Sequence, residues 1–390
     1  MNIRLKLAKY IAEVKNNKSL FVVSLFLILP VILDFLSVII GGKNATYFCY
    51  GSIFLFTVTF MGRQITKRRI IALLCIYLYV VFNIIEFPKS QPMIIRMEFL
   101  LTFLFFLPIS LFYVLPNNDW NQFFKIFAPL ASVAVLMNIF VVFFTDVDLY
   151  TDTERLGFNY MELSYAVLPS ICGLYAYSRE SKNIPYLILF VVGFFSIIAF
   201  GARATLIYTV LFVCLREILG AQKISSIILP MIVGIIIVLC LPEIINVIAN
   251  NSQFKESYAL NLFLRNDFFE HSTRTTIYDT CKNLVMKQGV DMYGLFGDRY
   301  LLGGTYPHNI FYEIILQFGW FFGVLLILWF VIKIIIILNR KEYRIIIVFF
   351  CCAILGRFFV SGSYLVEGRF WIMIGCILSL ASQPYKRKRI

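Results

Sequence analysis

The chain has 390 residues, of which 60% are hydrophobic and 41 are phenylalanine, and its mean hydropathy is +0.83. One soluble core cannot hide that much apolar surface, so the composition excludes a soluble globular protein and predicts a polytopic membrane protein. The net charge of +13 does not point to nucleic acid as a partner, because the cations are scattered between apolar runs and are not clustered on a polar domain.

Apolar runs separated by polar breakers predict an all-α membrane protein of about 12 transmembrane helices in a single integral domain, residues 1–390. The first run lacks a small-residue cleavage site, so we expect a retained helix and not a signal peptide. The predicted spans lie at 19–40, 46–61, 70–87, 93–115, 124–144, 161–178, 185–201, 204–219, 224–248, 308–331, 344–360 and 369–383.

The distribution of lysine and arginine predicts the orientation of these spans. Most of the 35 cations fall in segments that are cytoplasmic when the N-terminus is inside, so we expect both termini in the cytoplasm. The long segment 249–307 then forms an extracytoplasmic loop, and its length predicts short helices of its own.

One helix is predicted within this loop, capped by Ser272 or Thr273 and lying on the membrane surface. Arg274, Lys282 and Lys287 would face away from its apolar side. The apolar residues that recur at helical spacing are Ile277, Cys281, Leu284 and Val285.

A polar segment ending the loop is the strongest candidate for chemistry. Pro307 precedes a helix predicted to begin at about His308 and to continue through an apolar stretch long enough to cross a bilayer. His308 is one of two histidines, and Asn309 and Glu313 follow it at the membrane boundary. Imidazole exchanges protons near neutral pH, so His308 is a candidate proton-transfer residue. The alternative is a histidine that only caps the helix or bonds within the structure.

Arginines at the outer face are the candidate anion-binding residues. Arg203 lies between Ala202 and Ala204, small residues that would let a bulky ligand reach a guanidinium suited to phosphate. Its alternative role is to extend toward lipid headgroups. Further outer cations that could together hold a diphosphate are Arg155, Arg265, Arg274, Arg299, Arg357 and Arg369. Nine cysteines show no metal-ligand spacing, so we expect neither a metal site nor a cofactor.

Four segments in this order resemble the O-antigen polymerase and O-antigen ligase superfamily of bacterial membrane glycosyltransferases. The similarity covers about residues 145–331, and Ala202 stands where the family usually has serine. The segments are Arg155-Leu156-Gly157-Phe158-Asn159, Gly201-Ala202-Arg203-Ala204, Ser272-Thr273-Arg274 with Tyr278, Gly294 and Gly297, and His308-Asn309-Ile310-Phe311-Tyr312-Glu313 with Gly319 and Gly323.

The resemblance implies transfer of a glycan from an undecaprenyl-diphosphate-linked donor to a sugar hydroxyl of an acceptor, with inversion at the anomeric carbon. His308, Arg203 and Glu313 would be catalytic. Substrate-binding residues would be Arg155, Arg274, Arg299, Asn309 and Arg369. The site would face the periplasm or exterior of a bacterial inner membrane, with membrane lipids and a chain-length regulator as further partners. Polymerase is favoured over ligase, and a flippase or transporter for lipid-linked sugars is the alternative of another class.

Overall fold

The computed structural model describes residues 3–61, 65–114, 119–145, 156, 158–200, 203–220, 274–288 and 291–383. Within these ranges every regular element is helical, which confirms the predicted all-α class. The predicted span 224–248 and Arg155 lie outside the described residues.

The chain divides into two compact units, each assembled from separate stretches of sequence. The first unit contains Met1–Leu55, Asp119–Glu270 and Arg344–Ala353, and the second contains Phe56–Asn118, His271–Tyr343 and Ile354–Ile390. The single integral membrane domain expected from the sequence stays a prediction.

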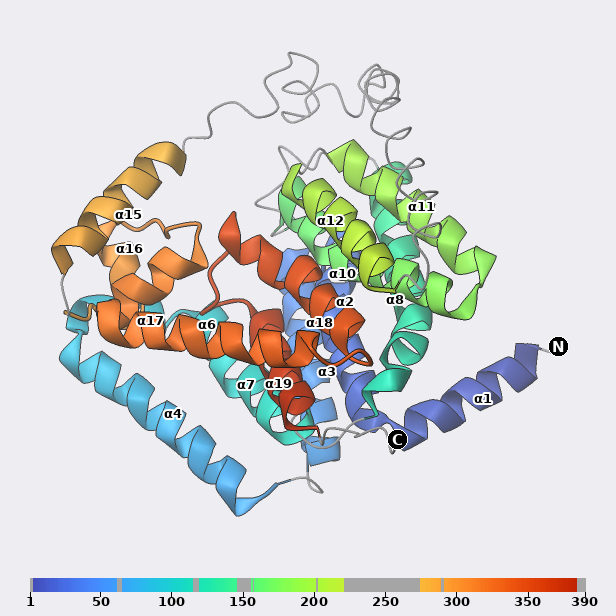
Figure 1. Cartoon of the computed structure of the whole chain (residues 1–390), viewed down its shortest axis with the longest axis horizontal. Coiled ribbons are helices and arrows are strands. Elements are labelled where there is room, and N and C mark those ends of the chain that lie inside the picture. Colours follow the sequence, from blue (N-terminus) through green and yellow to red (C-terminus); the bar gives the residue numbers. More distant parts are fainter. Residues whose placement is uncertain are drawn as a thin grey trace, which may run out of the picture. The chain divides into compact units, whose positions relative to one another are not determined.

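The first unit is a helical bundle in which α2, α8 and α10 lie side by side (Figure 1). Gly173 permits this packing, because a Cβ atom there would meet the ring of Phe127 on α8 at 2.3 Å. The helices of this unit are α1 (Ile3–Asn16), α2 (Lys18–Ile40), η4 (Trp120–Gln122), α8 (Phe123–Phe143), α10 (Tyr160–Ser181), α11 (Ile184–Phe200), α12 (Arg203–Gly220) and α18 (Arg344–Ala353), while α3 (Gly42–Met61) runs from the first unit into the second.

Aromatic side chains form the core where α8, α12 and α18 meet. The Phe349 ring lies 5.6 Å from that of Phe123, 5.7 Å from that of Phe127 and 6.1 Å from that of Phe212, measured between centroids. All four side chains are fully buried. Such ring pairs add specific geometry to apolar burial, so they fix how these helices pack.

The second unit carries the polar segments that the sequence singled out. Within it α15 and α16 pack against α17 (Figure 1). Its elements are α4 (Lys67–Glu86), η1 (Pro88–Ser90), α5 (Gln91–Ile94), α6 (Met97–Leu101), η2 (Thr102–Phe106), α7 (Leu107–Ile109), η3 (Ser110–Val114), α15 (Arg274–Gln288), α16 (Gly297–Leu301), α17 (Ile310–Leu338), η6 (Leu355–Phe359) and α19 (Gly368–Ser382).

Four described helices are long and apolar enough to cross a membrane, which agrees with the composition. They are Lys18–Ile40, Lys67–Glu86, Trp120–Phe143 and Ile310–Leu338. Pro88–Ile94 and Glu98–Phe112 qualify together as a fifth but are bent by 74°. The number of spans and their orientation remain predictions.

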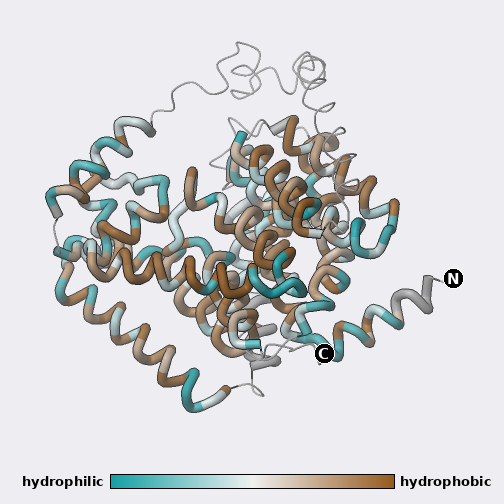
Figure 2. The backbone as a smooth tube through the Cα atoms, in the orientation of Figure 1, coloured by the Kyte–Doolittle hydropathy of each residue, from teal (hydrophilic) through white to brown (hydrophobic). Residues whose placement is uncertain are grey.

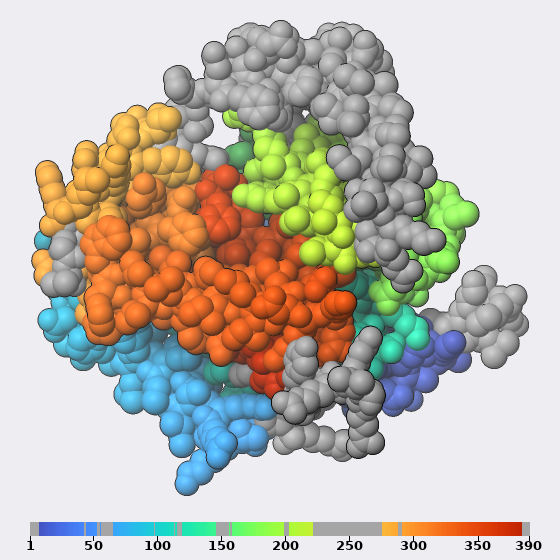
Figure 3. Space-filling model, viewed as in Figure 1, coloured from blue at the N-terminus to red at the C-terminus, as the bar shows by residue number. Residues whose placement is uncertain are grey.

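Large apolar side chains lie exposed along α4 and α17, and α17 is hydrophobic over most of its length (Figure 2). In the space-filling view the orange side chains of α17 lie at the surface of the protein (Figure 3). Exposed faces of this size need an apolar covering, and lipid supplies one. Examples from the two helices are Leu74, Leu78, Ile85, Phe321, Phe322, Leu325 and Trp329.

The structure corrects two of the expected helices. Residues 93–115 do not form one regular span, because α5 ends at Ile94 and the stretch Thr102–Val114 alternates between π-helical and α-helical turns around Pro108. The expected span 344–360 ends as an α-helix at Ala353 and continues only as the short 3₁₀ helix η6.

The helix predicted in this segment is confirmed as α15, while its predicted cap residues Ser272 and Thr273 lie outside the described residues. Cys281 and Val285 are buried against Leu316 of α17, with Ile277 and Leu284 packed around them. Lys282 and Lys287 are exposed, as the helical spacing predicted. Its position on a membrane surface stays a prediction.

Candidate functional site

A break in α17 organises the candidate site. Gly319 has φ 74° and ψ 169°, a backbone conformation that only glycine adopts readily, and it interrupts the helical hydrogen bonding. The carbonyls of Leu316 and Gln317 are therefore available to other donors, and they accept from the amides of Tyr293 at 3.3 Å and Gly294 at 3.1 Å. The loop that leads into α16 is thus attached to the broken turn of α17.

Asn83 on α4 holds the other side of this loop. Its side chain is fully buried, and its Oδ1 accepts from the Leu295 amide at 2.9 Å while its Nδ2 donates to the Tyr79 carbonyl at 2.9 Å. Gly294 has a φ of 75°, and a Cβ atom there would lie 2.4 Å from the Phe87 ring. These contacts fix the start of α16, which carries Asp298 and Arg299.

The centre of the site is a chain of buried polar side chains from three segments. Gln317 of α17 donates through Nε2 to Asp298 Oδ1 at 2.7 Å, and its Oε1 accepts from the hydroxyl of Tyr364. One turn earlier on the same helix face, Glu313 Oε1 accepts from the hydroxyl of Ser363. Asp298 and Gln317 are 0% exposed and Glu313 is 1% exposed. The connection between η6 and α19 is therefore hydrogen-bonded to the first segment of α17 through Ser363 and Tyr364.

Arg299 is the cation of this centre. It is 8% exposed, and its guanidinium lies over the rings of Phe296 at 4.7 Å and Tyr306 at 5.8 Å. No hydrogen bond or ion pair joins the guanidinium to another residue in the described part of the chain, and its Nε is enclosed without an acceptor. The charge is therefore stabilised by ring faces and by nearby carboxyl groups at longer range.

His308 does not begin the helix, which corrects the prediction. It has a φ of 55°, and α17 starts at Ile310 after Asn309, whose Oδ1 accepts from the Phe311 amide at 2.9 Å. The imidazole lies 4.0 Å from the Tyr306 ring, and the His308 carbonyl accepts from the Tyr278 hydroxyl at 3.3 Å. His308 is thus held between the loop and α15, in a left-handed turn.

A second group of polar side chains in the same unit is connected to the loop that carries Tyr306 and His308. The Tyr306 hydroxyl accepts from the Gly362 amide at 3.2 Å, one residue before Ser363. Nearby in sequence, Glu367 pairs with Arg357 at 2.7 Å and with Arg369 at 2.9 Å. Two guanidinium groups and one carboxylate leave this group with a net positive charge.

Two carboxyl groups outside the apolar spans have shifted pKa values in opposite directions. Burial raises the pKa of Asp298 above its usual range, although the Gln317 hydrogen bond and Arg299 oppose the shift. Burial acts in the same direction on Glu367, but Arg369 and Arg357 outweigh it and hold its pKa at about 2. Glu367 is therefore ionised throughout the physiological range.

The structure brings together Arg299, His308, Asn309 and Glu313 in the second unit, where Arg369 also lies. Arg203 belongs to the first unit as the half-buried first residue described in α12. The predicted junction between α11 and α12, Gly201-Ala202, lies outside the described residues. Arg274 begins α15.

Sequence reasoning missed Asp298, Tyr306, Ser363, Tyr364 and Glu367. Asp298 had a usable signal, since it adjoins Arg299 in a glycine-rich loop. Tyr306 also lay close to a candidate, two residues before His308. Ser363, Tyr364 and Glu367 come from a segment distant in sequence, for which no local pattern exists.

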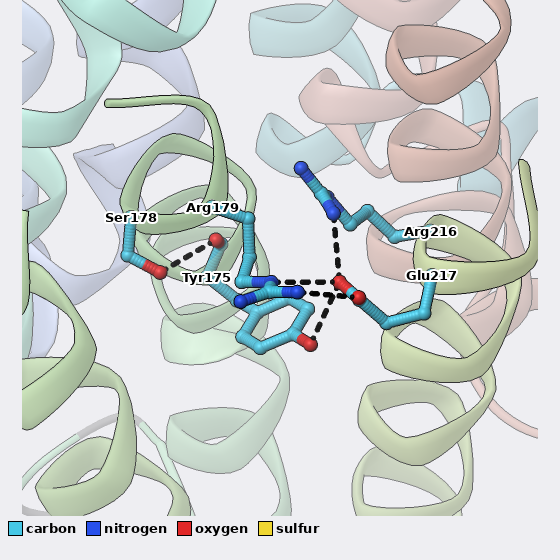
Figure 4. A network of polar contacts seen from close by, with 5 residues as sticks. All are labelled: Tyr175, Ser178, Arg179, Arg216 and Glu217. Carbon is cyan, nitrogen blue, oxygen red and sulfur yellow. Dashed lines mark hydrogen bonds and ion pairs between the residues drawn. The ribbon is translucent and has the colours of Figure 1, made fainter. Parts of the chain in front are cut away.

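A separate polar network in the first unit ties α10 to α12 (Figure 4). Glu217 is 4% exposed, and it accepts from Arg179 at 2.8 Å and 3.0 Å, from Arg216 at 2.7 Å and from the Tyr175 hydroxyl at 3.0 Å. Every donor points at the one carboxylate, so this network satisfies a buried charge and joins two helices.

Within the described residues, the geometry defines a helical protein with several apolar helices, a buried polar site in the second unit and a buried ion-pair network in the first. Among the described residues no group of three or more histidine, cysteine, aspartate or glutamate side chains could hold a metal ion. No protein-family model matches the chain, and a search of curated proteins finds no significant match.

Proposed function

We propose that the chain is a membrane glycosyltransferase that polymerises undecaprenyl-diphosphate-linked oligosaccharide repeats into O-antigen or capsular polysaccharide on the extracytoplasmic face. The observation that carries the proposal is the arrangement of Arg299 and His308 around Tyr306, at the start of α17 and beside the buried Glu313. A cation, an imidazole and a carboxyl group can together stabilise a departing diphosphate, orient an acceptor hydroxyl and exchange its proton.

In the proposed reaction an acceptor hydroxyl oxygen attacks the anomeric carbon of the donor. The bond from that carbon to the diphosphate oxygen breaks, and its electron pair leaves with the diphosphate, so the anomeric centre inverts. His308 receives or orients the hydroxyl proton. Asn309 uses Oδ1 to cap α17, which leaves its amide nitrogen to donate to a sugar hydroxyl.

Arginines balance the charge that develops on the leaving diphosphate. Arg203, Arg274 and Arg155 are assigned to the diphosphate by the family resemblance. Arg299 and Arg369 lie in the unit that holds His308, and their positive charges would also stabilise the departing diphosphate.

The proposal is tested by glycan ladder analysis of a deletion strain. A polymerase predicts loss of long chains with single repeats retained on their carrier. Full-length polymer that is never attached to its final carrier would indicate a ligase instead. Lipid-linked repeats trapped in the cytoplasmic leaflet would indicate a flippase.

Complementation with His308→Asn tests the site itself. Asparagine tolerates the left-handed conformation of residue 308 but cannot take a proton near neutral pH. We expect normal membrane abundance and a loss of about 10²–10⁴-fold in polymer formation, the usual effect of losing a positioned general base. The control is Thr305→Ala at an exposed neighbouring residue, which should leave the ladder unchanged. Normal long chains with His308→Asn would remove His308 from the chemistry.

A further inference from the structure

Two carboxyl groups and one guanidinium share a buried region of the second unit. Asp298 and Glu313 are almost completely buried, and Gln317, whose side chain bonds Asp298, lies one helical turn after Glu313 on the same face of α17. Arg299 follows Asp298 in α16, and its charge acts on both carboxyl groups. They come from different elements, α16 and α17, and the Gln317 side chain holds Asp298 in place. The two carboxyl groups therefore act as a pair.

The other titratable groups facing the pair are neutral at pH 7. Cys281 on α15 lies near Asp298, and burial raises the pKa of its thiol to about 11. Tyr364, from the segment before α19, faces both carboxyl groups, and Tyr79 on α4 adjoins Tyr364. Their hydroxyls stay protonated, so Arg299 is the one charged group that faces the pair in the described residues.

Charge counting then determines the protonation state. Two carboxylates and one guanidinium would leave one uncompensated negative charge among buried side chains, and a buried uncompensated charge is strongly unfavourable. The hydrogen bonds agree, because among the described residues Gln317 is the one side chain that donates to the Asp298 carboxyl group, and no side chain donates to its Oδ2. One bound proton restores neutrality.

We infer that Asp298 and Glu313 form a carboxyl pair that holds one proton at neutral pH and serves as the proton store of the site. The proton belongs to the pair and not to either residue. The role as a store rests on the proposed function, whereas the one-proton state does not.

The pair can compensate the charge that the transfer creates. When His308 takes the acceptor proton it becomes a cation, and Tyr306 is its link to Arg299. Release of the pair's proton to the departing diphosphate oxygen leaves a carboxylate that balances the imidazolium. Transfer of the proton from His308 to the pair then restores the resting state, so the net result is one proton moved from acceptor to diphosphate.

Infrared spectroscopy of the purified protein tests the one-proton state directly. A protonated carboxyl group has a C=O stretching band that carboxylates lack. The wild type at pH 7 should show one such band, and both Asp298→Asn and Glu313→Gln should lose it, because the remaining carboxyl group then ionises beside Arg299. The matched control is Glu217→Gln, which removes a buried carboxyl group paired with two arginines and should leave the band unchanged.

Three results would overturn the inference. The wild type could lack the band, one single variant could keep it, or sodium could raise the thermal stability and show that a metal cation balances the charge.

The thermal stability of the variants provides a second, independent test of the pair. The double variant should be less stable than the two single variants predict together, because only then is Arg299 left without a carboxylate. If the wild type shows the band but both single variants make a normal glycan ladder, the shared proton is confirmed and its role as a proton store is rejected.

Discussion

At the level of single residues, Glu367 shows how two neighbouring guanidinium groups determine the protonation state of a partly buried acid. Its carboxylate lies between Arg357 and Arg369, so removal of its charge would leave two guanidinium groups facing each other. The position resembles Glu217 in the first unit, which also lies between two arginines. In both places one carboxylate compensates the positive charges of two guanidinium groups.

Glu367 should make protein stability depend on pH in the acid range. Its folded-state pKa of about 2 lies below the ordinary value, so its contribution is fully present above the unfolded value of about 4.3 and is lost as the pH falls toward 2. Glu367→Gln should therefore lower the midpoint of thermal unfolding at pH 7. The difference from wild type should shrink between pH 4.3 and 2, measured in detergent. A difference that stays constant over this interval would contradict the ion pairs.

Glu217 and Arg179 should differ strongly in their effects on stability. Glu217→Gln removes the buried carboxylate that the partly buried Arg216 pairs with, and breaking a buried pair costs about 3–5 kcal/mol. The Arg179 side chain is 40% exposed, so Arg179→Gln should cost only about 0–1 kcal/mol. Chemical unfolding of both variants compares them. Equal losses would show that the exposed arginine matters as much as the buried carboxylate.

At the scale of an element, α17 shows why the site could be predicted only in part. His308, Asn309 and Glu313 stood out as polar residues before an apolar stretch, and the structure places them together. The break at Gly319 had no distinctive signal, because a glycine inside an apolar helix is common. Its conformation depends on donors from residues 293 and 294, which come from another part of the chain.

Gly319→Ala should destabilise the protein by about 1–3 kcal/mol, the cost of placing a side chain in a backbone conformation reserved for glycine. It should also reduce polymer formation, because Asp298 and Arg299 depend on the loop that this break holds. Gly51→Ala is the control, since an added Cβ there meets nothing within 4 Å in the helix α3. Unfolding midpoints measure both, and equal midpoints would show that the break is not required.

For the protein as a whole, composition was enough to predict the all-α class but not the arrangement of the helices. Helices α2, α8 and α10 lie close to their predicted bounds because long apolar runs ended by polar residues leave few alternatives. The stretch 93–115 was predicted wrongly because hydropathy records apolar length but not the π-helical turns around Pro108. Which segments share a unit could not be predicted, because each unit combines distant parts of the chain.

The predicted orientation is tested by labelling two exposed lysine positions in intact cells. In a background with the exposed Cys75 and Cys214 replaced by serine, Lys282→Cys on α15 should react with an impermeant thiol reagent. Lys341→Cys, which also lies at an exposed position, should not react until the cells are opened. The reverse pattern would invert the topology and place the candidate site in the cytoplasm.

The break in α17 also bears on how this helix could fit a bilayer. As one straight rod its 29 residues would measure about 44 Å, well beyond the roughly 30 Å of hydrocarbon, and the excess would demand steep tilt or a locally thickened bilayer. Divided at Gly319, residues 320–338 alone measure about 28 Å, which matches the hydrocarbon thickness. Hydrophobic mismatch is thereby relieved without tilt, and Glu313 and Gln317 belong to the segment that does not need to enter the lipid.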